Sequence, residues 1–211
     1  MLTLYYSPGS CALASHIALE EAGAEYRTVR LDFSRNEQRN PDYLALNPKG
    51  RVPVLITEQG ALSESPAILV YIAQRFPKAG LAPLDDPFAL AKLQSFNSYL
   101  CSTVHVAHAH RMRGTRWVDD PAALEAMKKK VPQSVGDAFR LIEQHMFEGP
   151  WVLGERYSVC DGYLLTMARW LEGDGVDIAT LPKVHDHLRR MEARPAVKKA
   201  LAEQLRPAVA A

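Results

Sequence analysis

The strongest constraint on the fold is a change in hydrophobic pattern about one third of the way along the chain. Up to residue 77, short runs rich in β-branched and aromatic residues alternate with stretches of helical spacing. Residues 78–87 then gather glycine, proline and aspartate, which is typical of a linker. Beyond it only helical patterns occur. The sequence therefore predicts an α/β unit over 1–77, a linker over 78–87 and an all-α unit over 88–211.

The order of patterns in the α/β unit is β-α-β-α-β-β-α, which implies a mixed sheet covered by helices. Strands are predicted at 3–7, 26–32, 52–56 and 61–63, and helices at 11–22, 42–46 and 65–77. In the second unit, helices are predicted at 88–112, 121–147, 158–171, 182–193 and 195–205. Pro132 either interrupts the second of these helices or is tolerated inside it.

Composition argues against several classes of function. Of the 211 residues, 47% are hydrophobic and 23% charged, as in an ordinary folded protein. A net charge of +1 provides no electrostatic basis for binding nucleic acid or an anionic membrane. No apolar run approaches the roughly 18 residues of a membrane span, and the first residues lack the features of a signal peptide. Three widely spaced cysteines, Cys11, Cys101 and Cys160, suggest neither a disulfide framework nor a zinc site, so a reducing, cytoplasmic setting is expected.

Cys11 stands at the start of the first predicted helix. Unpaired backbone N–H groups and the positive end of the helix dipole favour the nucleophilic thiolate at such a position. The alternative is a small, buried side chain without chemistry. The preceding Ser10 could cap the helix or donate a hydrogen bond to a ligand sulfur.

Glu64, Ser65 and Pro66 form a second candidate site. Ser65 is predicted to cap a helix with Pro66 at its first position, which leaves N–H groups and a hydroxyl available to an anion. Glu64 in front of them calls for a cation. A ligand that carries both a carboxylate and an ammonium would suit the pair, and a plain helix cap is the alternative.

A third candidate lies in the segment 47–53, where two prolines surround a Lys-Gly-Arg turn. A bend before Pro53 would free the N–H and C=O of Val52 for a peptide-like ligand. An ordinary loop is the alternative. Farther along, Ser158 and Asp161 have the spacing of a capping box, which we interpret as structural, with Cys160 in the core.

The helix predicted at 88–112 carries histidines and ends in basic residues. His105 and His108 are three apart and could share a face, but no cysteine or carboxylate nearby completes a metal set, so no metal is expected. The basic end comprises three arginines and a tryptophan, Arg111, Arg113, Arg116 and Trp117. With a nearly neutral chain, a solvated helix end is favoured over an RNA-binding patch.

Taken together, the segments 7–11, 47–53, 64–68 and 158–161 resemble motifs of the soluble glutathione S-transferases, in the same order and at similar distances. The Ser-Pro-Gly-Ser-Cys start, followed by His16, is similar to the bacterial beta class. The resemblance covers essentially the whole chain. It implies a thioredoxin-like domain, an all-α domain that forms the second-substrate pocket, and a homodimer.

The resemblance also implies where glutathione binds. Val52 and Pro53 would form a cis-proline bend whose backbone pairs with the cysteinyl part of glutathione, next to Arg51. Glu64 and Ser65 would hold the γ-glutamyl ammonium and carboxylate.

Further residues are assigned by the same resemblance to the sulfur and to the other end of glutathione. Cys11 would face the glutathione sulfur, where it can form a mixed disulfide, and His105 would lie near that sulfur. Ser98 falls on a nearby polar contact position. Arg35 could approach the glycyl carboxylate.

The predicted activity is conjugation of glutathione, as co-substrate and without a cofactor, to small hydrophobic electrophiles in detoxification. Thiol–disulfide exchange and peroxide reduction through Cys11 are rival reactions. Either Cys11 or Ser10 could activate the glutathione sulfur. From another class, a non-catalytic protein that binds glutathione or a hydrophobic ligand is the alternative.

Overall fold

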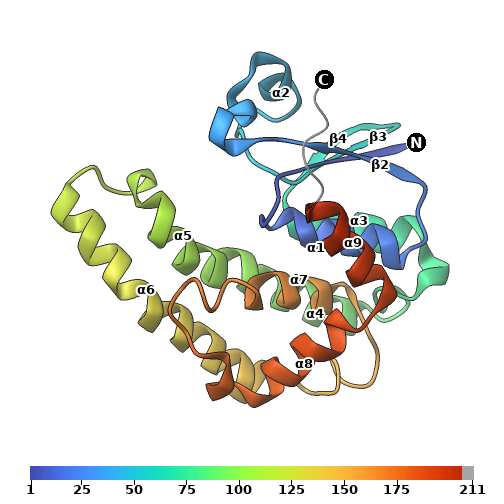
Figure 1. Cartoon of the computed structure of the whole chain (residues 1–211). Coiled ribbons are helices and arrows are strands. Elements are labelled where there is room, and N and C mark those ends of the chain that lie inside the picture. The colour runs from blue at the N-terminus through green and yellow to red at the C-terminus, as the bar shows by residue number, and fades with distance from the viewer. Residues whose placement is uncertain (206–211) are drawn as a thin grey trace.

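Residues 1–205 are described by a computed structural model of the chain (Figure 1). Strand β1 (Leu2–Tyr6) lies inside a four-stranded mixed sheet of order β2-β1-β3-β4. It pairs in parallel with β2 (Tyr26–Arg30) and antiparallel with β3 (Val54–Thr57), and β4 (Gly60–Ser63) pairs antiparallel with β3. The predicted order and the mixed sheet are confirmed. The last strands of the prediction differ only at their ends.

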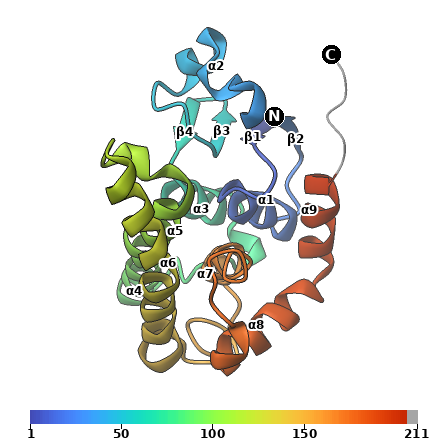
Figure 2. The ribbon, with the colours of Figure 1, turned by 60° about the vertical axis from the view of Figure 1, so that its left-hand side comes forward.

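Helices cover this sheet unequally. Figures 1 and 2 show α1 (Ala12–Glu21) and α3 (Ser65–Arg75) together on one side, and the short α2 (Pro41–Leu46) on the other. Three single 3₁₀ turns complete this part: η1 (Phe33–Arg35), η2 (Glu37–Arg39) and η3 (Pro77–Ala79). The core beneath α1 and α3 is built from fully buried aliphatic side chains, which include Leu4, Leu55, Ile68, Leu69 and Ile72.

Everything after α3 in the described chain is helical, apart from turns and one isolated bridge between Trp151 and Gly154. The elements are α4 (Pro87–Tyr99), η4 (Leu100–Val104), α5 (His105–Arg113), η5 (Gly114–Arg116), α6 (Pro121–Leu141), η6 (Ile142–Met146), α7 (Val159–Ala168), η7 (Ile178–Thr180), α8 (Pro182–Glu192) and α9 (Pro195–Leu205). The predicted combination of an α/β part with an all-α part is confirmed. None of the helices within residues 1–205 has the length and apolar character needed to cross a membrane.

Helix α7 joins the two parts into one hydrophobic core. All of its residues are buried, and Figure 2 shows it beneath α1 and between α4 and α8. Gly162 of α7 meets Ile17 of α1 so closely that a Cβ at Gly162 would lie 3.2 Å from Ile17 Cγ2. Glycine therefore permits the close approach of the two helices, which rigidly connects the sheet part to the helical part.

Pro132 does not interrupt α6, so that alternative of the prediction is wrong. The helix runs continuously from Pro121 to Leu141 with Pro132 inside it. Proline removes one backbone hydrogen bond, but Pro132 lies on the solvent-exposed face, where water can bind the freed carbonyl.

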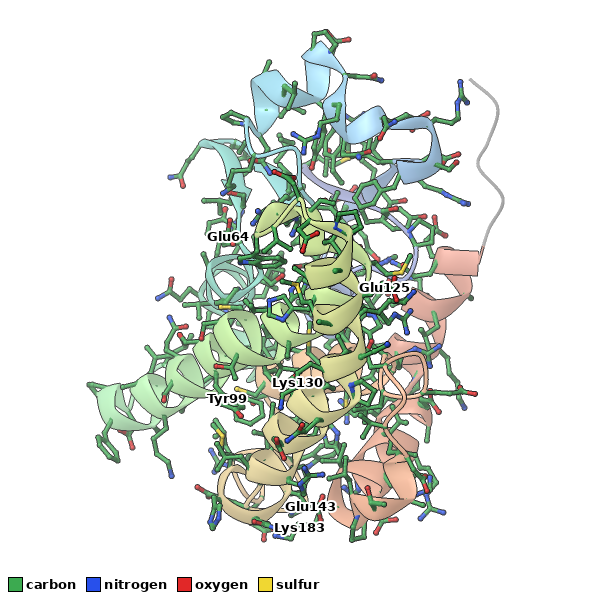
Figure 3. All side chains as sticks on the ribbon, turned by 90° about the vertical axis from the view of Figure 1, so that its left-hand side faces the viewer. Glu64, Tyr99, Glu125, Lys130, Glu143 and Lys183 are labelled. Atoms are coloured by element: carbon green, nitrogen blue, oxygen red, sulfur yellow. The ribbon has the colours of Figure 1, made fainter. Side chains whose placement is uncertain are left out.

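The run predicted at 88–112 is helical throughout but contains a π-helical stretch, η4, between α4 and α5. Such a stretch shifts the facing of the residues that follow it. Tyr99, at the end of α4, anchors this region to α6, because its hydroxyl donates to the carbonyl of Ala138 at 3.1 Å. Figure 3 shows Tyr99 beside α6.

Side chains cap the last helices. Ser158 and Asp161 form the predicted capping box at the start of α7, which confirms it. Helix α8 has no cap of its own. Instead, the Glu143 carboxylate accepts hydrogen bonds from the backbone N–H groups of Lys183 and Val184, at 2.9 and 3.0 Å. Figure 3 shows Glu143 next to Lys183 at the base of the molecule.

Candidate active site

A cavity of about 370 Å³ lies between the sheet part and the helical part. The sheet part supplies the loop before α1, the loop before β3 and the start of α3, and the opposite wall comes from η4, α5, η5 and the end of α7. Figure 3 shows Glu64 at the level where the two parts meet. Of the residues singled out in the sequence as site residues, the cavity brings together Ser10, Cys11, Arg51, Val52, Pro53, Glu64, Ser65 and His105.

Two predicted contacts lie outside this cavity. Arg35 is 76% exposed and pairs with Glu37 at 3.8 Å. Ser98 is exposed on α4, where its carbonyl accepts hydrogen bonds from Cys101 Sγ and Ser102 Oγ. In the ligand-free protein neither side chain lines the wall that carries Cys11.

Cys11 occupies the N-cap position of α1, with a residue exposure of only 9%. Its thiol donates to the carbonyl of Val52, with 3.5 Å between Sγ and the oxygen, and the Val52–Pro53 peptide bond is cis. Burial raises the pKa of the Cys11 thiol to about 11, and a hydrogen bond with Ser65 and the charge of Arg113 lower it by less. The expectation that the helix start favours a thiolate is therefore wrong, because desolvation outweighs the helix terminus.

The raised pKa predicts how Cys11 reacts with a small alkylating agent. With a pKa of about 11, its alkylation rate should rise roughly tenfold per pH unit from pH 7 to pH 10 and show no plateau below pH 10. Iodoacetamide labelling of the Cys11 peptide, followed by mass spectrometry, measures this rate. A plateau near pH 7 would show instead that the free protein holds a thiolate.

The loop that carries Ser10 is held from three directions. The Ser10 hydroxyl donates to the Ser7 carbonyl at 2.6 Å and accepts from the Ala12 N–H at 3.4 Å. Gly9, at φ +71°, donates its N–H to Gln204 Oε1, and its carbonyl accepts from Trp170 Nε1 at 3.0 Å. The Ser10 hydroxyl thus bonds only backbone groups on either side of it, and Trp170 and Gln204, far along the chain, hold the backbone of Gly9.

Glu64, not Ser65, occupies the N-cap position of α3, so the predicted cap is displaced by one residue. Glu64 has a positive φ of 72°, which is uncommon for a residue other than glycine and turns its backbone out of β4. Its Oε1 pairs with Lys49 Nζ at 2.7 Å. The sequence predicts the ammonium of a ligand at this carboxylate, and in the structure Lys49 is one cation that it meets. The pair uses one carboxylate oxygen and leaves the other for a ligand.

His105 faces the cavity from the start of α5. Burial, and to a smaller extent the charges of His108 and of nearby arginines, lower its pKa to about 4, so the imidazole is neutral at pH 7. The Trp170 ring lies 5.2 Å from the His105 ring and stacks on His108 at 4.1 Å between centroids. His108 in turn bonds the buried carboxylate of Asp174 at 2.7 Å. A neutral imidazole at this place can form a hydrogen bond with a thiol but is too weak a base to take its proton.

Some cavity residues were not identified from the sequence. Tyr163 and Trp170 lie far along the chain, and no local pattern marks them. Cys101 precedes His105 by four residues, a helical spacing that could have revealed it. Arg113 and Arg116 are exposed, as expected of a solvated helix end, but they also line the cavity. Within residues 1–205 no group of three His, Cys, Asp or Glu side chains could hold a metal ion.

Fold and cavity define a thioredoxin-like sheet with an appended all-α part and a cysteine at the start of the first helix. Residues 1–74 match the family described as "Glutathione S-transferase, N-terminal domain". A glutathione S-transferase from Escherichia coli O157:H7 is 30% identical over 205 residues, which cover 96% of this chain and 98% of that protein. The chain belongs to the glutathione S-transferase family.

Solved structures agree with this membership. A glutathione transferase homologue from Sulfitobacter, with bound glutathione, is 46% identical with a TM-score of 0.93, and the match covers 96% of this chain and 98% of that one. A beta class glutathione S-transferase from Sphingomonas chungbukensis is 32% identical with a TM-score of 0.83, over 96% and 98% of the two chains. The likeness to the bacterial beta class that the first motif indicated is confirmed.

Proposed function

We propose that this chain is a glutathione transferase whose cavity binds glutathione on the wall formed by the sheet part. One observation carries the proposal: Cys11, the cis Val52–Pro53 bend, Glu64 and Ser65 converge on a single cavity. The bound glutathione in the Sulfitobacter relative supports the same ligand for this chain. We assign glutathione binding to residues 1–77, the linker to 78–87 and the second-substrate pocket to 88–211.

In this proposal each part of glutathione has a matching group. The backbone of Val52 pairs with the cysteinyl part. The γ-glutamyl carboxylate meets the N–H groups at the start of α3 beside Ser65, and its ammonium meets Glu64. Arg51, which lines the cavity, takes the glycyl carboxylate in place of Arg35, which lies outside it.

The glutathione sulfur then lies between Cys11 and His105. The thiol proton of glutathione passes to solvent, and the protonated Cys11 thiol donates a hydrogen bond to the thiolate that results, while His105 stays neutral beside it. In conjugation, the thiolate forms a C–S bond with the electrophilic carbon, and the leaving group departs with its electron pair. Ser10 keeps a structural role, because both bonds of its hydroxyl are to backbone.

The same site supports disulfide exchange. The Cys11 sulfur would attack a disulfide substrate and form a new S–S bond with one half of it, while the other half departs as a thiolate and takes up the proton that Cys11 loses. A glutathione thiolate would then attack that mixed disulfide and release Cys11 again. Family likeness further supports a cytoplasmic homodimer that acts in detoxification, and light scattering coupled to size exclusion measures the subunit number.

Affinity capture followed by turnover tests the proposal. The chain is expected to bind immobilised glutathione, to elute with free glutathione, and to turn over at least one of an aryl halide, a hydroperoxide and a mixed disulfide. Capture without turnover of any of the three would favour a non-catalytic glutathione binder. Failure of capture would contradict glutathione binding altogether.

Replacing Glu64 by Gln is expected to weaken glutathione binding about tenfold, because the ligand ammonium loses a charged acceptor. Calorimetric titration with S-methylglutathione, which binds without reacting, measures the Kd. Glu58→Gln serves as the control, because Glu58 is 81% exposed in the β3–β4 turn and pairs only with the chain N-terminus, at 3.6 Å. An unchanged Kd in Glu64→Gln would remove Glu64 from the site.

A further inference from the structure

Three arginine side chains line the cavity. Arg113, at the end of α5, and Arg116, in η5, line the cavity opposite the glutathione wall, with Arg51 across from them. Burial lowers the pKa of Arg116, and the charges of Arg51, Arg113 and Arg39 lower this pKa further. Three guanidinium groups that line one cavity repel one another, and this repulsion costs free energy unless an anion binds among them.

This charge has no acidic partner within residues 1–205. The only acidic side chain on the cavity wall is Glu64, which already pairs with Lys49 at 2.7 Å. The described part of the chain contains no ion pair of Arg51, Arg113 or Arg116. Their neighbour Arg111 differs, because it pairs with Asp174 at 3.5 Å.

Apolar side chains surround the same arginines. Met112 and Trp117 line the cavity although they are 74% and 45% exposed, an unusual exposure for large hydrophobic residues. The guanidinium carbon of Arg113 lies 5.7 Å from the centre of the Phe33 ring, which also lines the cavity. The cavity therefore presents positive charges without an acidic partner next to a hydrophobic surface.

We propose that the second substrate is an amphipathic anion, a small electrophile with an apolar body and a carboxylate that Arg113 and Arg116 bind. Its apolar body rests on Met112, Trp117 and Phe33. The inference depends on the proposed transferase activity and narrows the expected hydrophobic electrophile to a carboxylate-bearing one. Arginine suits this role, because its planar guanidinium can donate two parallel hydrogen bonds to a carboxylate.

Two other ligands for the arginines fit less well. The carboxylates of glutathione are assigned to the start of α3 and to Arg51, both on the sheet side, whereas Arg113 and Arg116 belong to the helical part. Nucleic acid is excluded by scale, because the cavity measures about 370 Å³ and the chain has a net charge of only +1.

A matched pair of aryl chlorides tests the proposal. The probes are 4-chloro-3,5-dinitrobenzoate and 1-chloro-2,6-dinitrobenzene, which differ only in the carboxylate. In both, the glutathione thiolate forms a C–S bond, chloride leaves with the bonding electrons, and the thiol proton passes to solvent. The quantity measured is the ratio of kcat/KM for the anionic probe to that for the neutral one, each corrected for the uncatalysed rate.

The double variant Arg113→Gln and Arg116→Gln is expected to lower this ratio at least about tenfold. The control removes the same number of charges elsewhere, as Arg140→Gln with Arg189→Gln. Both control residues are exposed and pair with an acid three positions earlier on their own helix. The control should change the ratio less than about twofold, since distant surface charges are screened.

The outcomes separate this inference from the transferase proposal. If the double arginine variant leaves the ratio unchanged, or raises only the KM for glutathione, the anion site is overturned. If neither probe is turned over, only conjugation to aryl chlorides fails, and equilibrium dialysis with S-methylglutathione present decides whether the arginines bind the anion. The anion site is supported if the wild-type protein binds 3,5-dinitrobenzoate more tightly than 1,3-dinitrobenzene and the double variant loses this difference. Equal binding of the two compounds by the wild-type protein would overturn it.

Discussion

Replacement of Asp161 by Ala is expected to lower the free energy of unfolding by about 3–5 kcal/mol. The Asp161 carboxylate is fully buried and accepts four hydrogen bonds. Two come from the backbone N–H groups of Val152 and Ser158, at 2.9 and 2.8 Å. The others come from the Ser158 hydroxyl at 3.3 Å and from His187 Nε2 at 2.9 Å. Alanine would leave all four donors buried without an acceptor.

The loss should be large because the local structure offers no replacement. His187 is itself fully buried, and its Nδ1 has no hydrogen-bond partner in the described structure, so its ring cannot turn to a second acceptor without cost. Helix α7, which Asp161 helps to cap, is the buried connection between the sheet part and the helical part.

Urea unfolding followed by tryptophan fluorescence measures the stability of Asp161→Ala. The control is Asp137→Ala, because Asp137 is 58% exposed on α6 and pairs only with Arg140. That control should change stability by less than about 1 kcal/mol. If Asp161→Ala also lowers the free energy of unfolding by less than about 1 kcal/mol, the four hydrogen bonds of the Asp161 carboxylate do not stabilise the fold as expected.

Replacement of Cys11 by Ala is expected to reduce thiol–disulfide exchange at least about a hundredfold, because the mixed disulfide can no longer form. Glutathione binding should weaken by less than about tenfold, since the assigned contacts of the tripeptide lie at Val52, Glu64 and Ser65. Conjugation should fall less than exchange, because Cys11 only donates a hydrogen bond in that reaction.

Cys11→Ser separates the two roles of the thiol. Serine keeps a hydrogen-bond donor but cannot form a disulfide, so conjugation should recover relative to Cys11→Ala while exchange stays lost. Reduction of a glutathione mixed disulfide measures exchange, and an aryl halide measures conjugation. If Cys11→Ala retains exchange and Cys101→Ala loses it, the reactive thiol is Cys101, which lines the same cavity.

Much of the fold follows from local pattern. The alternation of strand and helix spacing up to residue 77 and the helical spacing beyond it predicted the mixed sheet and the all-α part. The sequence did not decide whether Pro132 interrupts its helix. It shows that a backbone hydrogen bond is lost, but not whether water can reach the freed carbonyl. Only the exposed face of α6 resolves this point.

Sequence alone determined those features of the site that depend on neighbours along the chain: the place of Cys11 at a helix start and the capping box of Ser158 and Asp161. These are local because helix ends and turns are set by a few consecutive residues. The bend before Pro53 was one of two alternatives until the structure showed a cis peptide bond there. The charge state of Cys11 was decided by tertiary structure, because burial raises its pKa to about 11 against the helix terminus. Tertiary packing also brought Arg113 and Arg116 to the cavity, since electrostatic and solvation energies depend on distance in space rather than in sequence.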